Sequence, residues 1–113
     1  MSSEKMTTLA TSLLMRTHGG DLPWSETAHE AYFILSFSDS SVSITRRTWE
    51  EPNEWIYVVS VHNGLGTEID SLRASPGEDA HETLENLYEE ARRSALKPDK
   101  IVDNILTRLA SDY

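Results

Sequence analysis

The stretch "EWIYVVSVHNG", residues 54–64, decides the fold of this chain. Aromatic and β-branched residues follow one another from Trp55 to Val59, with Val61 after Ser60, which is typical of a strand inside a sheet. Asn63 and Gly64 come next, and both tolerate the positive φ angles of a tight hairpin turn. The stretch therefore predicts a central strand with an antiparallel neighbour on its C-terminal side.

Three further runs have strand composition: "AYFILSF" (31–37), "SVSITRRTW" (41–49) and "TEIDSL" (67–72). The connections between the four runs are short, with Asp39-Ser40 as the first turn and "EEPNE" (50–54) as the second. Short connections join strands that are neighbours in space. The sequence therefore predicts a four-stranded antiparallel meander, preceded by a loop over residues 21–30.

The turns also predict which residues lie opposite one another. They pair Phe37 with Val42, Trp49 with Trp55, Arg47 with Tyr57, and Val58 with Ile69. Since side chains alternate along a strand, these registers sort the sheet into two faces. One face collects Phe33, Leu35, Phe37, Val42, Ile44, Ile56, Val58 and Ile69. The other collects Tyr32, Ile34, Thr45, Arg47, Trp49, Trp55, Tyr57, Val59, Val61 and Leu72.

Helical patterns flank the sheet on both sides. A first helix is expected from about Ser3 to His18, with an apolar stripe at i, i+3, i+4 spacing and Gly19-Gly20 as its end. After the sheet, "SPGE" (75–78) resembles a capping box that opens a second helix. The apolar stripe of that helix contains Ala80, Leu84, Leu87, Tyr88, Ala91 and Ala95.

Lys97-Pro98 ends the second helix, because proline disfavours helical geometry in the residue before it. A third helix follows, with a stripe of Ile101, Val102, Ile105, Leu106 and Leu109. The expected fold class is α+β, with both C-terminal helices packed on the Phe33 face of the meander.

The chain is acidic, with 19 acidic and 10 basic residues and a net charge of −9. Nucleic-acid binding relies on Lys and Arg that neutralise phosphates, so this charge disfavours nucleic acid and anionic membranes as partners. The Arg92-Arg93 pair has acidic neighbours on its helix, which indicates a solvated surface and not a DNA-reading helix. No stretch has the pattern of a signal peptide or a membrane span. We expect a cytoplasmic protein of one domain, residues 1–113, with residues 1–3 disordered.

The stretch "LYEEARRSALKPDKIVDNIL", residues 87–106, resembles the C-terminal pattern of a group of small bacterial proteins of unknown function. In those proteins a sheet is followed by a Leu-Tyr…Ala-Arg-Arg…Ala-Leu helix and a final helix that contains Asp. The upstream order "AYFILSF…SVSI…IYVVSV" is similar to theirs as well. The resemblance covers about residues 9–110 and implies the same α+β fold, with no activity attached to it.

The polar residues show no pattern of a catalytic or metal site. The four histidines, His18, His29, His62 and His81, lack the spacing of metal ligands on a helix or a strand. The chain has no cysteine and no nucleophile motif such as G-x-S-x-G. We therefore expect no cofactor, no metal and no catalysis. The alternative is a small-molecule-dependent or metal-dependent enzyme whose histidines and carboxylates converge only in the fold.

The second sheet face is the predicted site. If the helices all lie on the other face, it exposes partner-binding residues of the types that dominate interfaces, namely Tyr32, Arg47, Trp49, Trp55 and Tyr57. Arg47 between Tyr32 and Tyr57 would form a cation–π stack. The alternative is that the first helix crosses over and buries this face in a three-layer domain. The expected function is a non-catalytic protein–protein interaction module: an acidic accessory or inhibitor-like, immunity-like protein. Its partner would be another protein or a second copy in a homodimer.

Overall fold

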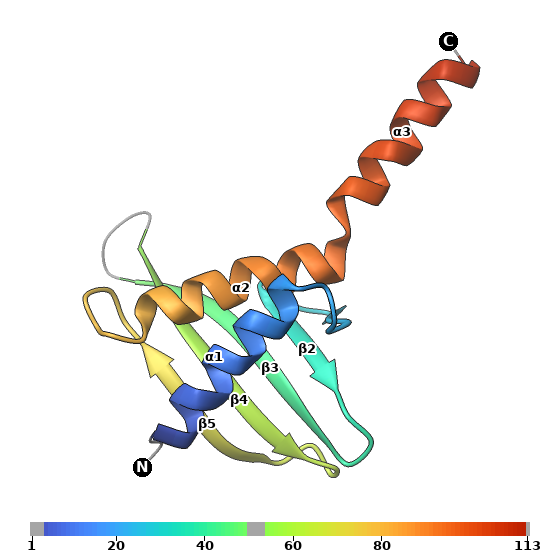
Figure 1. Cartoon of the computed structure of the whole chain (residues 1–113). Coiled ribbons are helices and arrows are strands. Elements are labelled where there is room, and N and C mark those ends of the chain that lie inside the picture. The colour runs from blue at the N-terminus through green and yellow to red at the C-terminus, as the bar shows by residue number, and fades with distance from the viewer. Residues whose placement is uncertain (1–3, 50–53, 113) are drawn as a thin grey trace.

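The computed structural model of the chain describes residues 4–49 and 54–112. Its element order, drawn in Figure 1, is α1 (Glu4–His18), β1 (Ser25–Glu26), β2 (Tyr32–Ser36), β3 (Ser40–Thr48), β4 (Trp55–Asn63), β5 (Glu68–Ala74), α2 (His81–Leu96) and α3 (Pro98–Asp112). The strands form one antiparallel sheet in the order β1-β2-β3-β4-β5. The α+β class, the N-terminal helix and the antiparallel sheet are confirmed. The predicted disorder of residues 1–3 and most of the "EEPNE" connection lie outside the described residues.

The sheet has five strands, so the prediction of four is wrong. The additional strand, β1, lies in the predicted loop and pairs with β2, with Ser25 opposite Ile34 and Glu26 opposite Phe33. Two residues are too few to show the alternation by which strands are recognised in a sequence. The hydroxyl of Thr27 donates to the carbonyl of Tyr32 at 2.9 Å and holds the turn that follows β1.

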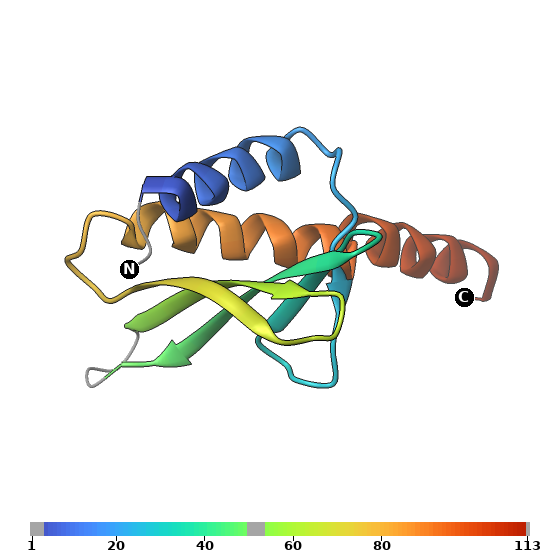
Figure 2. The same cartoon turned by 90° about the horizontal axis from the view of Figure 1, so that it is seen from below.

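Both α1 and α2 cover the same face of the sheet, and no helix in residues 4–49 and 54–112 covers the other (Figure 2). The three-layer alternative, with the first helix on the second face, is therefore wrong. The core between the two layers is formed by Met6, Ala10, Leu13, Trp24, Phe33, Leu35, Val42, Ile44, Tyr57, Val59, Ala74, Leu84, Leu87, Tyr88 and Ala91. The predicted stripes of the first two helices supply the helical part of this core.

The capping box predicted at "SPGE" does not start α2. The carboxylate of Glu78 accepts from the backbone N–H of Ser75, as in such a box, but this contact closes a separate turn. Gly77 holds a φ of 89° there, in the left-handed region that favours glycine. The helix begins later, at His81, because a helical path cannot pass through that conformation.

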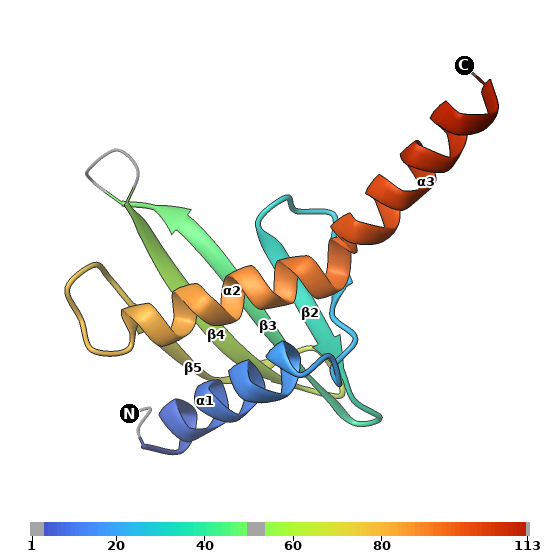
Figure 3. The ribbon, with the colours of Figure 1, turned by 45° about the horizontal axis from the view of Figure 1, so that its top comes forward.

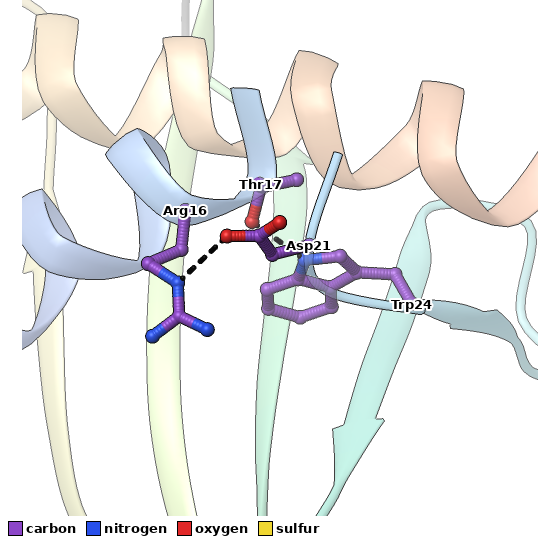
Figure 4. A network of polar contacts seen from close by, with 4 residues as sticks. All are labelled: Arg16, Thr17, Asp21 and Trp24. Atoms are coloured by element: carbon purple, nitrogen blue, oxygen red, sulfur yellow. Dashed lines mark hydrogen bonds and ion pairs between the residues drawn. The ribbon is translucent and has the colours of Figure 1, made fainter. Parts of the chain in front are cut away.

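The segment between α1 and β1 is anchored to both helices, and Figure 4 shows its contacts with α1. The buried indole N–H of Trp24 donates to the hydroxyl of Thr17 at 2.9 Å. The hydroxyl of Ser94, on α2, accepts from the Trp24 backbone N–H and donates to the Leu22 carbonyl. These bonds satisfy the polar groups of a buried tryptophan and fix where the chain enters the sheet.

Replacing Thr17 with valine is expected to lower the free energy of unfolding by about 1–3 kcal/mol, because the buried Trp24 N–H loses its acceptor while the volume is kept. Urea unfolding followed by tryptophan fluorescence measures the change. Thr11→Val is the matched control, since that hydroxyl is exposed and bonds only to its own helix. Equal stability of Thr17→Val and Thr11→Val would contradict the structural role of this bond.

The third helix leaves the body of the molecule and projects past the edge of the sheet (Figures 1 and 3). At its start, Lys97 has φ 50° and ψ 59°, which is left-handed geometry, and its N–H donates to the carbonyl of Arg93. Pro98 then opens α3 with a fixed φ and no N–H to satisfy. The left-handed residue turns the chain away from the axis of α2, so the prediction that both C-terminal helices pack on the sheet is wrong for α3.

Candidate functional site, an exposed amphipathic helix

The most unusual surface of the described chain is the apolar face of α3, which we call the α3 stripe. It consists of Ile101, Val102, Ile105, Leu106 and Leu109, each 50% to 58% exposed. Every described side chain of α3, from residue 98 to residue 111, is exposed. By contrast, Leu84 and Leu87 of the equally amphipathic α2 are completely buried. Both helices thus have an apolar stripe, but only the stripe of α2 packs against the rest of the described chain.

An uncovered helix of this kind is poorly stabilised by itself. Isolated helices of about 12–15 residues are marginal in water, and most helical stability in proteins comes from packing of the apolar face. Three stripe residues, Ile101, Val102 and Ile105, are β-branched and have reduced helix propensity. Covering the five half-exposed side chains would contribute about 4–8 kcal/mol of gross hydrophobic free energy. The α3 stripe therefore has the composition of a docking surface.

The charge of α3 differs from that of the rest of the chain. Residues 98–112 contain three acidic and two basic residues, a net charge of −1, whereas the whole chain carries −9. Most of the negative charge therefore lies on the body. A strongly cationic partner would be attracted to the body, while the α3 stripe presents apolar contact area with little net charge.

The predicted partner-binding residues do not share one face. In the structure Thr48 lies opposite Trp55 and Arg47 opposite Ile56, one residue away from the predicted register. Because side chains alternate along a strand, this shift of one residue exchanges the two faces of β4 and β5. Their side chains that were predicted to share a face with a given side chain of β3 lie on the other face in the structure. Tyr57 is buried under the helices, at 1% exposure, and half-buried Trp55 packs against the same core. Tyr32 and Arg47 stay on the open face, and Trp49 follows the end of β3, where its N–H donates to the Glu54 carbonyl.

The registers of the β2–β3 and β4–β5 pairs also differ from the prediction, but by an even number of residues, so they do not exchange the two faces of the sheet. Leu35 pairs with Val42, a shift of two residues that leaves the faces of β2 and β3 unchanged. Val58 pairs with Arg73, so the connection after β4 is longer than a two-residue Asn-Gly turn. Asn63 still organises it, since its side-chain oxygen accepts from the N–H groups of Leu65 and Thr67.

The open face is mostly polar, which explains why it needs no cover. At its centre Ser43 lies opposite Ser60, and both small side chains are shielded by their neighbours. The Ser43 hydroxyl lies 3.1 Å from Nε2 of His62. In the described part of this face, polar residues lie opposite the apolar ones, with Ser43 opposite Ile34 and Thr45 opposite Val58.

Among residues 4–49 and 54–112, the cation–π contacts are formed by Arg46 and not by Arg47. The Arg46 guanidinium lies 4.1 Å from the ring centroid of Trp55 and 4.8 Å from that of Tyr88. Burial raises the pKa of the Tyr57 hydroxyl, against the opposing effect of a hydrogen bond from Arg46. Burial also raises the pKa of Tyr88, against the charges of Arg46 and Arg92. Both phenols thus stay protonated through the neutral range, and the cluster is a packed part of the helix-covered face.

A hollow of about 540 Å³ borders this cluster and is lined in part by Glu30, Arg46 and Arg92. A larger open groove of about 1340 Å³ lies between the end of α1 and the second half of α2, with Asp21, Glu90 and Arg93 on its walls. Both hollows mix charges of either sign. Neither concentrates groups of one kind that would define a ligand.

The histidines have separate partners. His18 contacts the Glu90 carboxylate, and His29 faces the ring of Tyr32. His62 contacts Ser43, and Nε2 of His81 donates to the Trp55 carbonyl at 2.8 Å. Among residues 4–49 and 54–112, no three His, Asp or Glu side chains come together as a metal site would need. The enzyme alternative gains no supporting geometry from these contacts.

Comparison with protein-family models, with curated proteins and with solved structures finds no match to this chain. The resemblance to small bacterial α+β proteins therefore stays a prediction, as does the cytoplasmic location. Within the described residues, no helix is long and apolar enough to cross a membrane.

The sequence pattern predicts the apolar stripe of α3 correctly, but the predicted packing of that stripe on the sheet is wrong. The pattern alone could not tell the two cases apart, since a covered helix and a docking helix have the same periodicity. The Lys97-Pro98 break, which was predicted correctly, is the feature that separates α3 from the body.

Proposed function

We propose that this chain is a non-catalytic protein–protein interaction module that docks through the α3 stripe. The observation that carries the proposal is a 15-residue amphipathic helix with all of its described side chains exposed. Amphipathic helices commonly bind by laying their apolar face against another protein, with anchors at i, i+3, i+4 and i+7 spacing. The stripe at 101, 102, 105, 106 and 109 has this spacing.

The proposed docking surface replaces the aromatic sheet face predicted from the sequence. Two members of that predicted set, Trp55 and Tyr57, are packed against the helix-covered core. The acidic body is the second feature of the proposal, because a net charge of −9 accelerates association with cationic partners. The accessory or inhibitor-like class rests on that charge alone.

Site-specific photo-crosslinking in the source cell tests the proposal. A photoreactive amino acid at Val102, on the α3 stripe, is expected to give a protein adduct of defined mass. The same amino acid at Thr107, on the opposite side of the helix, is the control and is expected to give little or none. Strong adducts from neither position, or equal adducts from both, would contradict docking through the stripe.

A further inference from the structure

We propose that the occupant of the α3 stripe is a second copy of this chain, with the two α3 helices packed antiparallel around a two-fold axis at Ile105. This inference rests on the proposed docking function of α3 and names the partner. Ile101, Ile105 and Leu109 follow one another at intervals of four residues, so these three residues of the stripe are symmetric about Ile105. A two-fold axis at Ile105 sets Ile101 of one copy against Leu109 of the other.

The remaining two stripe residues, Val102 and Leu106, lie opposite Arg108 and Asn104 under this axis, but they share one flank of the helix pair. Val102 and Leu106 lie beside Ile105 on one flank of the stripe, and the two-fold axis brings Val102 of one copy near Leu106 of the other. A two-fold interface requires such self-complementarity, because the same patch is used on both sides. Ile101, Ile105 and Leu109 thereby meet apolar partners directly, and Val102 and Leu106 adjoin one another along the flank.

Charge selects the antiparallel arrangement over the parallel one. The helices themselves carry a net charge of −1 each, so they repel one another weakly. Antiparallel packing leaves the two acidic bodies at opposite ends of a 15-residue helix pair, separated by about 22 Å. That distance exceeds the Debye length of about 8 Å at physiological salt. A parallel pair would place both bodies at the same end, where their charges oppose association.

The size of the interface sets the expected affinity. A contact between two such helices buries less than the roughly 1,200 Å² of a standard interface, which corresponds to a weak dimer. We expect a dissociation constant of about 10–100 µM. Pairing also orders a helix that is marginal alone, so the helical content of α3 is expected to rise with protein concentration.

Light scattering coupled to size exclusion tests the assembly on the purified chain, from about 1 µM to about 1 mM. The wild-type mass is expected to rise from 12.8 kDa towards twice that value. Ile105→Lys sets two ammonium groups face to face on the axis and is expected to weaken the dimer by at least about 100-fold. Thr107→Lys adds the same charge on the opposite side of the helix and is expected to dimerise like the wild type.

Cysteine crosslinking tests the geometry, since the chain has no cysteine of its own. Ile105→Cys is expected to form a disulfide-linked dimer under mild oxidation, because its two copies meet on the axis. The two copies of Leu109→Cys would be about 12 Å apart along the helix pair, beyond the reach of a disulfide. Equal crosslinking of both variants would indicate a parallel pair and overturn the proposed arrangement.

The outcomes separate this inference from the proposed function. A wild-type chain that stays monomeric up to about 1 mM, or an Ile105→Lys variant that dimerises like the wild type, overturns the two-copy proposal. If photo-crosslinking from Val102 then captures a different protein, the docking function of α3 stands without self-association. If Val102 gives no adduct either, both proposals fail.

Discussion

Replacing Tyr57 with alanine is expected to lower the free energy of unfolding by about 3–5 kcal/mol, the range measured for loss of a large buried aromatic side chain. The ring is 1% exposed and packs between the rings of His81 and Tyr88, with centroid distances of 5.2 and 5.6 Å. Its removal leaves a cavity under α2 that the neighbouring rings cannot close. Chemical denaturation monitored by circular dichroism measures the loss.

Tyr32→Ala is the matched control for this prediction. Tyr32 lies on the open face, is half-buried, and has a ring contact to exposed His29 at 6.0 Å. Its loss is expected to lower the free energy of unfolding by less than about 1 kcal/mol. Because the sequence-based register places both tyrosines on one exposed face, the comparison distinguishes the two registers. A larger loss for Tyr32 than for Tyr57 would refute the register seen in the structure.

The second prediction with a large expected effect compares the same substitution, leucine to alanine, in α2 and in α3. Leu84→Ala in α2 is expected to lower the free energy of unfolding by about 2–5 kcal/mol, because its side chain is completely buried in the core. Leu109→Ala in α3 is expected to change it by less than about 0.5 kcal/mol at concentrations where the chain is monomeric. Both changes remove the same atoms from an apolar helical stripe. Thermal unfolding at low micromolar protein concentration makes the comparison.

The pair also tests whether α3 belongs to the folded core. Similar destabilisation by both changes, independent of protein concentration, would show that α3 packs on its own body in solution. Destabilisation by Leu109→Ala that appears only at high concentration would instead reflect loss of the dimer. In that case the α2 stripe stabilises the fold of the single chain, whereas the α3 stripe stabilises the dimer.

Local patterns were sufficient for the order and type of most elements. The α1 stripe predicts a helix to His18, and the observed helix runs from Glu4 to His18. The four predicted strands are present because β-branched and aromatic composition and turn residues act over a few neighbouring positions. The additional strand β1 escaped prediction, since its two residues pair through the backbone and show no pattern.

The register between β3 and β4 could not be predicted from the sequence. The strand "EWIYVVSVH" has five consecutive apolar or aromatic residues, from Trp55 to Val59, so alternation does not choose which side of this stretch faces the core. The choice depends on packing against α2, because Tyr57 of β4 belongs to the same core cluster as Tyr88 and Leu84 of α2. A shift of one residue then decides whether Trp55 and Tyr57 form an exposed site or the core.

The sequence by itself determined that this chain forms an acidic α+β fold with three amphipathic or flanking helices around an antiparallel sheet. Composition and short-range periodicity are properties of neighbouring residues, and they need no knowledge of the rest of the chain. Only the tertiary structure decided which apolar stripe is covered. The left-handed Lys97 turns α3 away from a sheet face that α1 and α2 already fill, and so the last stripe is left exposed as the proposed docking surface.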